Sequence, residues 1–454
     1  MHIEELHLQN FRGFQELRLK LPSKLAVFIG VNGSGKSSIL DSIAILLSQF
    51  VFELRKTRKR VSEFELTEDD ININSETTRN SIRLVIDSDT KLFWEITIGT
   101  DVPKLRLLKS KISKREINKY ASQILKALED KPDLSLPLLL YYKTQRIVID
   151  SSSGNSASAK DGSENEEFRQ FIRKPNQIDA YKTAFSNNVN NFQDFFDWFK
   201  EEEEYENEVR LREDTNFRNP SLEIVREALK RFLEGFPDTE FSNLHVVRVS
   251  SNKELGIRRL KNPLLVIEKN GQDFKLNQLS DGEKNLLMLV IDIARRLAIL
   301  NPSITNPSKI LEKGEGIVLI DEVDLHLHPQ WQRIVLQSFT KTFPKCQFIV
   351  TTHSPQVLSG VKRENVFILE DSEVVEVTPY TFGRDSNSIL SEVMGVEKRP
   401  IKVQEQLDNC FELIDDGKLE EAKIELKKLS ELLGKNDSEI VRAYTLIDFF
   451  NRVE

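Results

Sequence analysis

Residues 30–37 read Gly-Val-Asn-Gly-Ser-Gly-Lys-Ser and form a complete phosphate-binding loop of the pattern G-x-x-x-x-G-K-[ST]. A short apolar run at 25–29 comes directly before this loop and predicts a buried strand. The residues after it, 37–48, carry apolar side chains at helical spacing. Strand, glycine-rich loop and helix in this order are what a phosphate site requires. The sequence therefore predicts an α/β fold with a nucleotide at the start of this helix.

The residue types in the loop suit the phosphates of a nucleotide. Glycines permit the backbone shapes that turn amide N–H groups towards an anion. Lys36 supplies positive charge to the β- and γ-phosphates, and the Ser37 hydroxyl is placed to bind Mg²⁺. The alternative, a glycine-rich turn that only precedes a helix, is disfavoured by the strand before it. We therefore expect ATP and Mg²⁺ as cofactors, held by Asn32, Gly33, Ser34, Gly35, Lys36, Ser37 and Ser38.

Two acidic residues follow a second apolar run, residues 316–320. At the end of such a strand, Asp321 is placed to hold Mg²⁺, and Glu322 can orient or deprotonate the attacking water. Acidic residues often end strands without any catalytic role, so this pair alone is weak evidence. The phosphate loop earlier in the chain makes ATP hydrolysis the favoured interpretation.

Three histidines that follow the acidic pair in the sequence are candidates for a role at the site. His353 follows a third apolar run, 347–350, in a segment of hydroxyl and imidazole groups. A lone histidine is more often structural, but here we expect a catalytic one that senses the γ-phosphate. His326 and His328 could suggest a metal site, yet Asp324 is their only carboxylate neighbour in sequence. We expect them in a loop at a subunit seam, with no metal of their own.

A further motif, Leu-Ser-Asp-Gly-Glu at 279–283, precedes a periodic helix at 284–300. Ser280 is suited to be the N-cap of that helix, and capping could be its entire role. In the functional interpretation the same exposed helix end, with Ser280 and Gly282, receives the γ-phosphate of a nucleotide bound to a neighbouring subunit.

Taken together, these motifs resemble those of the RecF/SMC branch of ABC-type ATPases. In that class the signature loop of one subunit closes over the nucleotide in the phosphate loop of another, which implies a homodimer or higher oligomer through the ATPase heads. The departures from Leu-Ser-Gly-Gly-Gln, at Asp281 and Glu283, are common in the SMC-like branch. The resemblance also implies that Arg12 lies near the nucleotide and that Gln145 is a Q-loop residue linking Mg²⁺ to the insertion. The segments that carry the resemblance are 10–14 (Asn-Phe-Arg-Gly-Phe), 30–37, 279–283, 318–322, 325–329 (Leu-His-Leu-His-Pro) and 352–355 (Thr-His-Ser-Pro).

A compact insertion, and the segment Gly-Arg-Asp-Ser-Asn-Ser at 383–388 before a helical tail, resemble the ATPases of bacterial anti-phage modules. The Septu type, with its retron-associated versions, is the nearest in pattern. This resemblance implies a separate partner nuclease, of the HNH type, and a retron reverse transcriptase or nucleic acid as a further partner. Some relatives carry a C-terminal TOPRIM nuclease, which needs an Asp-x-Asp pair. The tail after His353 is short, helical and without that pair, so we expect no nuclease domain here.

The expected organisation is an α/β ABC-type ATPase head, a mixed sheet with flanking helices, built from residues 1–50 and 275–384. Residues 51–274 form a mainly helical insertion with a β-hairpin, a helical block and a mobile loop at 151–167. Residues 385–454 form a C-terminal helical appendage. No heptad repeat persists over several turns, so a long coiled-coil arm is not expected.

Charge and composition narrow the possible partners. The net charge of −8 argues against a broadly basic nucleic-acid coat. Basic runs at 55–60 and 104–115 are explained equally well by a solvent-exposed face or by DNA contact. We favour DNA contact only because the insertion often contacts nucleic acid in the family that the chain resembles. Two cysteines fit a reducing compartment. No signal peptide and no run of ~20 apolar residues are evident, so we expect a cytoplasmic protein without a membrane.

The main hypothesis is an ATP-dependent switch in a defence complex, in which head closure and hydrolysis govern a partner nuclease. One alternative is a DNA repair or recombination ATPase that acts as a clamp or loader. A second is a scaffold whose nucleotide site turns over very slowly. DNA-stimulated turnover, a silent nuclease complex and near-zero turnover would distinguish the three.

Overall fold

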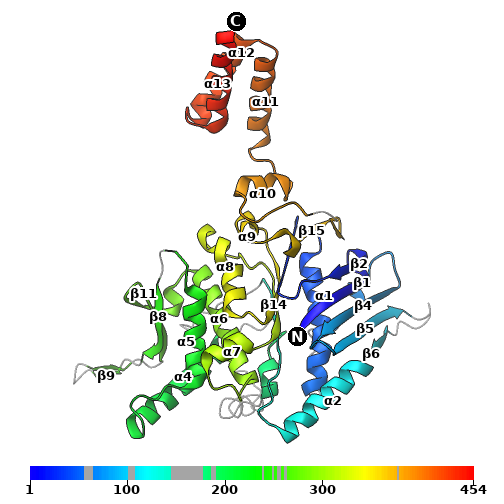
Figure 1. The fold of residues 1–454 in the computed structure, drawn as a ribbon, viewed down its shortest axis with the longest axis vertical. Coiled ribbons are helices and arrows are strands. Elements are labelled where there is room, and N and C mark those ends of the chain that lie inside the picture. Colours follow the sequence, from blue (N-terminus) through cyan, green and yellow to red (C-terminus); the bar gives the residue numbers. More distant parts are fainter. Residues whose placement is uncertain are drawn as a thin grey trace. The chain divides into compact units, whose positions relative to one another are not determined.

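The computed structural model describes residues 1–453 except 56–64, 101–107, 145–176, 186–190, 238–239, 248–249, 253–256, 260–262 and 376–377. The chain divides into two compact units, Met1–Asp385 and Ser386–Glu454. Each unit is described separately below (Figure 1). The loop expected at 151–167 lies outside the described residues.

A six-stranded sheet forms the centre of the first unit, in the order β16-β15-β3-β14-β13-β7. All neighbouring pairs are parallel except β15 with β16. The apolar runs predicted as strands are buried along their length, as parallel strands covered on both faces require. Because parallel strands end at the same edge, this topology brings the segments after several strands together. The strands are β3 (Leu25–Gly30), β7 (Leu138–Tyr142), β13 (Gly316–Ile320), β14 (Cys346–Thr351), β15 (Val366–Glu370) and β16 (Glu373–Val374).

A second sheet is antiparallel and has the order β2-β1-β4-β5-β6. The expected hairpin at 81–98 is present as β4 and β5, and Asp87 forms its turn by accepting hydrogen bonds from the amides of Asp89 and Thr90. The helix expected from 111 begins at Arg115 instead, because the residues before it pair with β5. The elements are β1 (His2–Phe11), β2 (Phe14–Lys20), β4 (Thr77–Val85), β5 (Lys91–Thr100), β6 (Leu108–Ser113) and α2 (Arg115–Asp130).

Helix α1 (Lys36–Arg55) lies between these two sheets and contacts both. The Trp94 indole of β5 donates a hydrogen bond to the carbonyl of Leu46 on α1, at 3.0 Å. Contrary to the expectation from sequence, this helix is long and apolar enough to cross a membrane. Its most apolar window is 67% buried within the protein, which is the position of a core helix in an α/β domain.

The other side of the central sheet is covered by helices. On α8, Phe339 stacks against Phe348 of β14, with ring centroids 5.2 Å apart, and Phe232 of α5 packs on Phe339 at 4.7 Å. Helix α6 contacts β7 and α5. The elements are α5 (Pro220–Leu233), α6 (Asp281–Leu300), α7 (Pro307–Lys313), α8 (Pro329–Thr342) and α9 (Pro355–Ser359), with short 3₁₀ turns at Glu68–Asp70, Gln177–Tyr181, Leu276–Gln278 and Arg363–Asn365.

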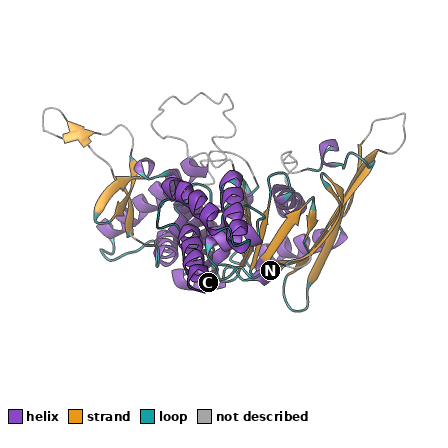
Figure 2. Cartoon of the chain, turned by 90° about the horizontal axis from the view of Figure 1, so that it is seen from above, coloured by secondary structure: helices purple, strands orange, loops and turns teal. Residues whose placement is uncertain are grey.

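A small three-stranded sheet, β12-β11-β8, packs near α4 (Asn191–Arg212) and α5. This sheet and the long antiparallel strands lie at opposite ends of the first unit, with helices between them (Figures 1 and 2). The strands expected near 244–249 and 264–268 are therefore present, although they do not join the central sheet. The bounds are β8 (Phe241–Val247), β9 (Ser250–Asn252), β10 (Ile257–Arg259), β11 (Leu264–Lys269) and β12 (Gln272–Lys275).

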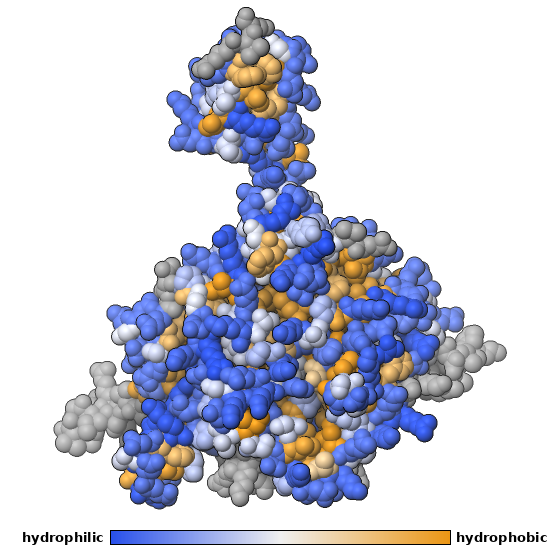
Figure 3. Space-filling view, in the orientation of Figure 1, coloured by the Kyte–Doolittle hydropathy of each residue, from blue (hydrophilic) through white to orange (hydrophobic). Residues whose placement is uncertain are grey.

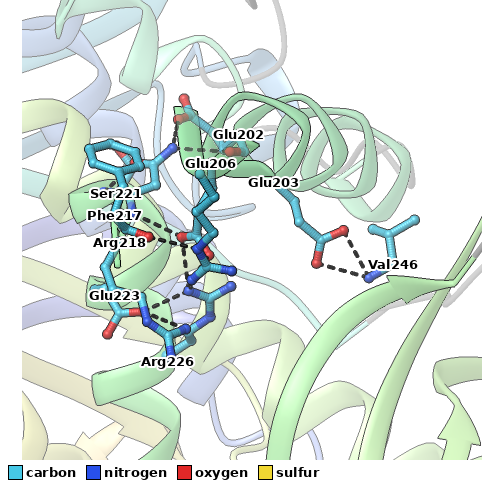
Figure 4. A network of polar contacts seen from close by, with 11 residues as sticks. Glu202, Glu203, Glu206, Phe217, Arg218, Ser221, Glu223, Arg226 and Val246 are labelled. Atoms are coloured by element: carbon cyan, nitrogen blue, oxygen red, sulfur yellow. Dashed lines mark hydrogen bonds and ion pairs between the residues drawn. The ribbon is translucent and has the colours of Figure 1, made fainter. Parts of the chain in front are cut away.

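Buried carboxylates on α4 hold this part of the insertion together (Figure 4). Glu206 has 1% side-chain exposure and forms ion pairs with Arg210 and Arg226. Glu203 accepts a hydrogen bond from the backbone amide of Val246 on β8, at 3.1 Å. A buried charge that is paired and hydrogen-bonded in this way is tolerated, whereas removal of one partner is costly. These contacts fix α4 against α5 and β8.

The second unit consists of helices. The helical hairpin expected around the turn at 415–418 is present, with Gly417 at φ 75°. A third long helix completes a small core that contains Leu407, Leu426 and Ile440. Apolar side chains also remain on this unit's surface, among them Ile424, Leu432 and Phe449, and Figure 3 shows apolar surface there. The helices are α10 (Ser386–Glu392), α11 (Ile401–Asp415), α12 (Leu419–Leu433) and α13 (Ser438–Val453).

Candidate functional site

The phosphate-binding loop connects β3 to α1, as the sequence predicts. Its glycines Gly30, Gly33 and Gly35 all have positive φ, at 151°, 84° and 98°. A Cβ on Gly35 would also overlap the ring of Phe14, which belongs to the Asn-Phe-Arg-Gly-Phe segment. The loop therefore needs glycine for two reasons, backbone conformation and the close approach of an aromatic ring.

Lys36 is directed back across the loop. Its ammonium group donates hydrogen bonds to the carbonyls of Gly30 at 2.9 Å and Val31 at 2.8 Å. Burial lowers the pKa of Lys36, and the nearby charges of Asp321 and Glu322 oppose that shift. The buried hydroxyl of Ser34 has no hydrogen-bond partner among the described residues. A positive charge and an unsatisfied donor in one loop are what an anionic phosphate chain would satisfy, so the loop fits a nucleotide.

Asp321 lies at the centre of a group of hydroxyls from three other segments. One carboxylate oxygen accepts hydrogen bonds from Ser37 at 3.2 Å and Thr351 at 2.6 Å, and the other accepts from Thr144 at 2.8 Å. The hydroxyl of Ser37 and the carboxylate of Asp321 are hard oxygen ligands of the kind Mg²⁺ prefers. The predicted metal-binding pair is thus side by side, although the residues lie 284 positions apart in the sequence.

The backbone turns sharply at Glu322. This residue has φ 49°, an uncommon conformation for a side chain of its type, and its amide donates to the Thr351 hydroxyl at 2.7 Å. Thr351 therefore binds both members of the acidic pair and fixes the left-handed turn. Strained backbone of this kind is frequent where a side chain must be aimed at a reacting group.

His353 follows β14, at the same edge as the acidic pair, and is half-buried. The hydroxyls beside it have structural roles. Thr352 donates to Asp324 at 2.5 Å, and Ser354 caps α9 by accepting from the amide of Val357 at 3.2 Å. These two hydroxyls are therefore engaged within the protein, and the role of the His353 imidazole as a γ-phosphate sensor stays a prediction.

Arg12 lies in the turn between β1 and β2, with φ 49°. Its guanidinium pairs with Asp41 of α1 at 2.8 Å and with Asp70 at 2.9 Å, and it lies 3.4 Å from the Ser38 hydroxyl. Burial would lower the pKa of Arg12, but these two carboxylates raise it. Arg12 thus contacts the first turn of α1 at Ser38, the residue after Ser37, and its proximity to a bound nucleotide stays a prediction.

The signature residues form the beginning of α6. Ser280 caps the helix by accepting from the amide of Glu283 at 3.3 Å, and the Glu283 carboxylate accepts in return from the Ser280 amide at 2.9 Å. Glu283 is also paired with Lys269, at 2.6 Å. The Glu in place of the usual glutamine therefore completes a capping box.

Gly282 of the signature contacts the Leu-His-Leu-His-Pro segment. A Cβ at this position would overlap the carbonyl of His326, so the two loops touch through the glycine. Between them is a cavity of about 300 Å³ whose lining includes Ser280, His328 and Trp331. Among the described residues no group of three or more potential metal ligands is present, and His328 caps α8.

The sequence also predicted a Q-loop glutamine and two basic runs that contact DNA. Gln145 lies outside the described residues, as do residues 56–60 of the first basic run. In the second run, Lys114 is described and is paired with Glu53 at 3.2 Å. DNA contact through these runs stays a prediction.

The sequence did not indicate two residues of this site, Asp41 and Thr144. Asp41 lies on α1 and has no motif of its own. A signal was present for Thr144, because it follows the strand that ends at Tyr142.

The chain matches the family model described as "AAA domain, putative AbiEii toxin, Type IV TA system" over residues 25–359. The chain belongs to this family. It is similar to the "Retron Vc95 probable ATPase" of Vibrio cholerae serotype O1 biovar El Tor, with 30% identity over 90% of this chain and 81% of the relative. Similarity to the "Retron Ec83 probable ATPase" of Escherichia coli is 30% over 88% of this chain and 77% of the relative. The "Septu protein PtuA" of Bacillus mycoides (strain KBAB4) is 32% identical over 36% of this chain and 23% of the relative.

These similarities confirm the relation to the ATPases of retron and Septu systems that the motifs indicate. The α/β fold class, with a C-terminal helical region, is also confirmed. Nucleotide binding follows from the family together with the loop geometry.

Proposed function

We propose that this family member hydrolyses ATP at the site formed by the phosphate loop, Asp321 and Glu322, with Glu322 as the general base. The observation that carries the proposal is the convergence of Ser37, Thr144 and Thr351 on the carboxylate of Asp321. Ser37 and Asp321 would hold Mg²⁺, which would supply neutralising charge for the β- and γ-phosphates. Lys36 is placed to bind the same phosphates, and the turn at Glu322 would direct its carboxylate towards the attacking water.

The second part of the proposal concerns assembly. The start of α6 has a complete capping box, and Ser280 is exposed at this positively polarised helix end, whereas Gly282 is buried against the His326 carbonyl. We infer that this end docks on the γ-phosphate of a nucleotide in a second copy of the chain, so that ATP closes a dimer of heads. His353 would sense that phosphate from its own subunit.

The third part concerns the purpose of the switch. The similar proteins bear names from retron and Septu systems, and they match this chain over most of their length in the two retron cases. We infer that head closure controls a partner nuclease effector in anti-phage defence, of the HNH type, with a reverse transcriptase or nucleic acid as a further component. A nuclease within this chain is not part of the proposal.

The catalytic part is tested with Glu322→Gln. The amide cannot accept a proton from water, so turnover should fall by about 100-fold or more while ATP affinity stays within about twofold. Lys36→Ala is the contrasting variant, because it should weaken ATP binding itself. Hydrolysis by Glu322→Gln at the rate of the unaltered chain would show that another group is the base.

The assembly part is tested in the Glu322→Gln background, where bound ATP persists. Ser280→Arg places bulk and charge where the second γ-phosphate must dock. Light scattering with and without ATP should show pairing in the parent and none in the Ser280→Arg variant, with unchanged nucleotide affinity per site. Equal pairing by both proteins would exclude the composite site.

A further inference from the structure

Two adjacent tyrosines end strand β7 and bind helices on opposite sides of the central sheet. The Tyr141 hydroxyl donates to Asp41 of α1 at 3.0 Å. The Tyr142 hydroxyl donates to Asp292 of α6 at 2.9 Å. Successive side chains of a strand point to opposite faces, so a tandem pair can hold one helix on each face.

The two acceptors belong to the two parts of the proposed ATP site. Asp41 is one turn beyond Ser37 on the helix that follows the phosphate loop, and it also binds Arg12. Asp292 lies on the helix that begins at the signature. Its carboxylate is buried and accepts from the Arg296 guanidinium at 2.9 Å, so the tyrosine binds a fixed, charged group.

The end of β7 is also joined to the acidic pair. The carbonyl of Tyr142 accepts a hydrogen bond from the amide of Asp321 at 2.8 Å, and Thr144 donates to the Asp321 carboxylate. A displacement at Ser37 or Asp321 on nucleotide binding therefore reaches β7 directly. The hydrogen bond from the Tyr142 hydroxyl to Asp292 is a polar link from β7 to α6.

We propose that Tyr141 and Tyr142 are positioning residues that couple the phosphate loop to the orientation of the signature helix within one subunit. The inference rests on the proposed function, in which that helix docks on a second subunit's nucleotide. Tyrosine suits this role because its ring is rigid and its hydroxyl reaches a partner across a packed layer. Burial raises the pKa of Tyr141, so its hydroxyl stays a donor at neutral pH.

The test is hydrogen–deuterium exchange of α6 amides with and without ATP, on the full chain carrying Glu322→Gln and Ser280→Arg. The first change retains ATP, and the second prevents direct protection of α6 by another copy. In this parent, ATP should alter exchange at the start of α6. Adding Tyr142→Phe should reduce that response by about fivefold, the lower end of usual coupling between sites, with ATP affinity unchanged within about twofold.

The matched control is Tyr181→Phe. The Tyr181 hydroxyl is buried and donates to the Pro137 carbonyl at 2.5 Å. Its removal therefore also costs one buried hydrogen bond, but not one to Asp41 or Asp292. The α6 response should survive in this control. Tyr141→Phe should reduce the response as Tyr142→Phe does, and it provides a second variant if either protein folds poorly.

Two outcomes would overturn the inference: an α6 response in Tyr142→Phe equal to that of the parent, or no response of α6 to ATP in the parent. Failure of the proposed function has a different signature. In that case the Glu322→Gln chain with Ser280 intact would not pair on ATP addition, while α6 would still respond to the nucleotide through Tyr142.

Discussion

Thr351 joins the two acidic residues, and its replacement by valine tests the site most sharply. The side chain is fully buried; it donates to Asp321 and accepts from the amide of Glu322. Valine keeps the shape but removes the hydroxyl. The change then loses a hydrogen bond to a charged group and leaves a buried amide without a partner, which together should destabilise the first unit by roughly 2 to 4 kcal/mol.

The assay is chemical denaturation followed by tryptophan fluorescence. All three tryptophans, Trp94, Trp198 and Trp331, belong to the first unit, so the signal reports that unit. ATP turnover should also fall by about tenfold or more, because the turn that aims Glu322 loses its anchor. Thr351→Ser is the control, since it retains the hydroxyl and should stay near the unaltered chain in both measurements. A Thr351→Val chain within about 0.5 kcal/mol of the original, and with unchanged turnover, would refute this account of the acidic pair.

Two further predictions concern the phosphate loop and the first basic run. Gly35→Ala should destabilise the first unit more than Gly33→Ala, because both sites have positive φ but only at Gly35 does a Cβ meet the Phe14 ring; equal losses by denaturation would remove that contact from the explanation. Reversing several of the charges at 55–60 should weaken DNA binding for all sequences alike and flatten its salt dependence; unchanged affinity and salt slope would assign this run to a solvated surface.

The sequence alone indicated the family and proposed the main site residues. A phosphate loop needs glycine, lysine and a hydroxyl at fixed spacing because its chemistry is local to one strand, one turn and one helix. Such a pattern can be recognised in the sequence without knowledge of the fold. The acidic pair after an apolar run and the cap at Ser280 are local in the same sense. Burial of the strands was likewise evident from their apolar runs.

Only the tertiary structure decided how these local pieces meet. Ser37, Thr144, Asp321 and Thr351 come from four segments, and their hydrogen bonds depend on the order in which β3, β14, β13 and β7 pair. Strand order is set by packing of whole faces, which no short pattern encodes. For the same reason the sequence did not show where α1 lies: its composition would suit a membrane, but the helix is between two sheets. The positions of Asp41 and Asp292 likewise depend on the tertiary structure, because a helix packs on each face of β7.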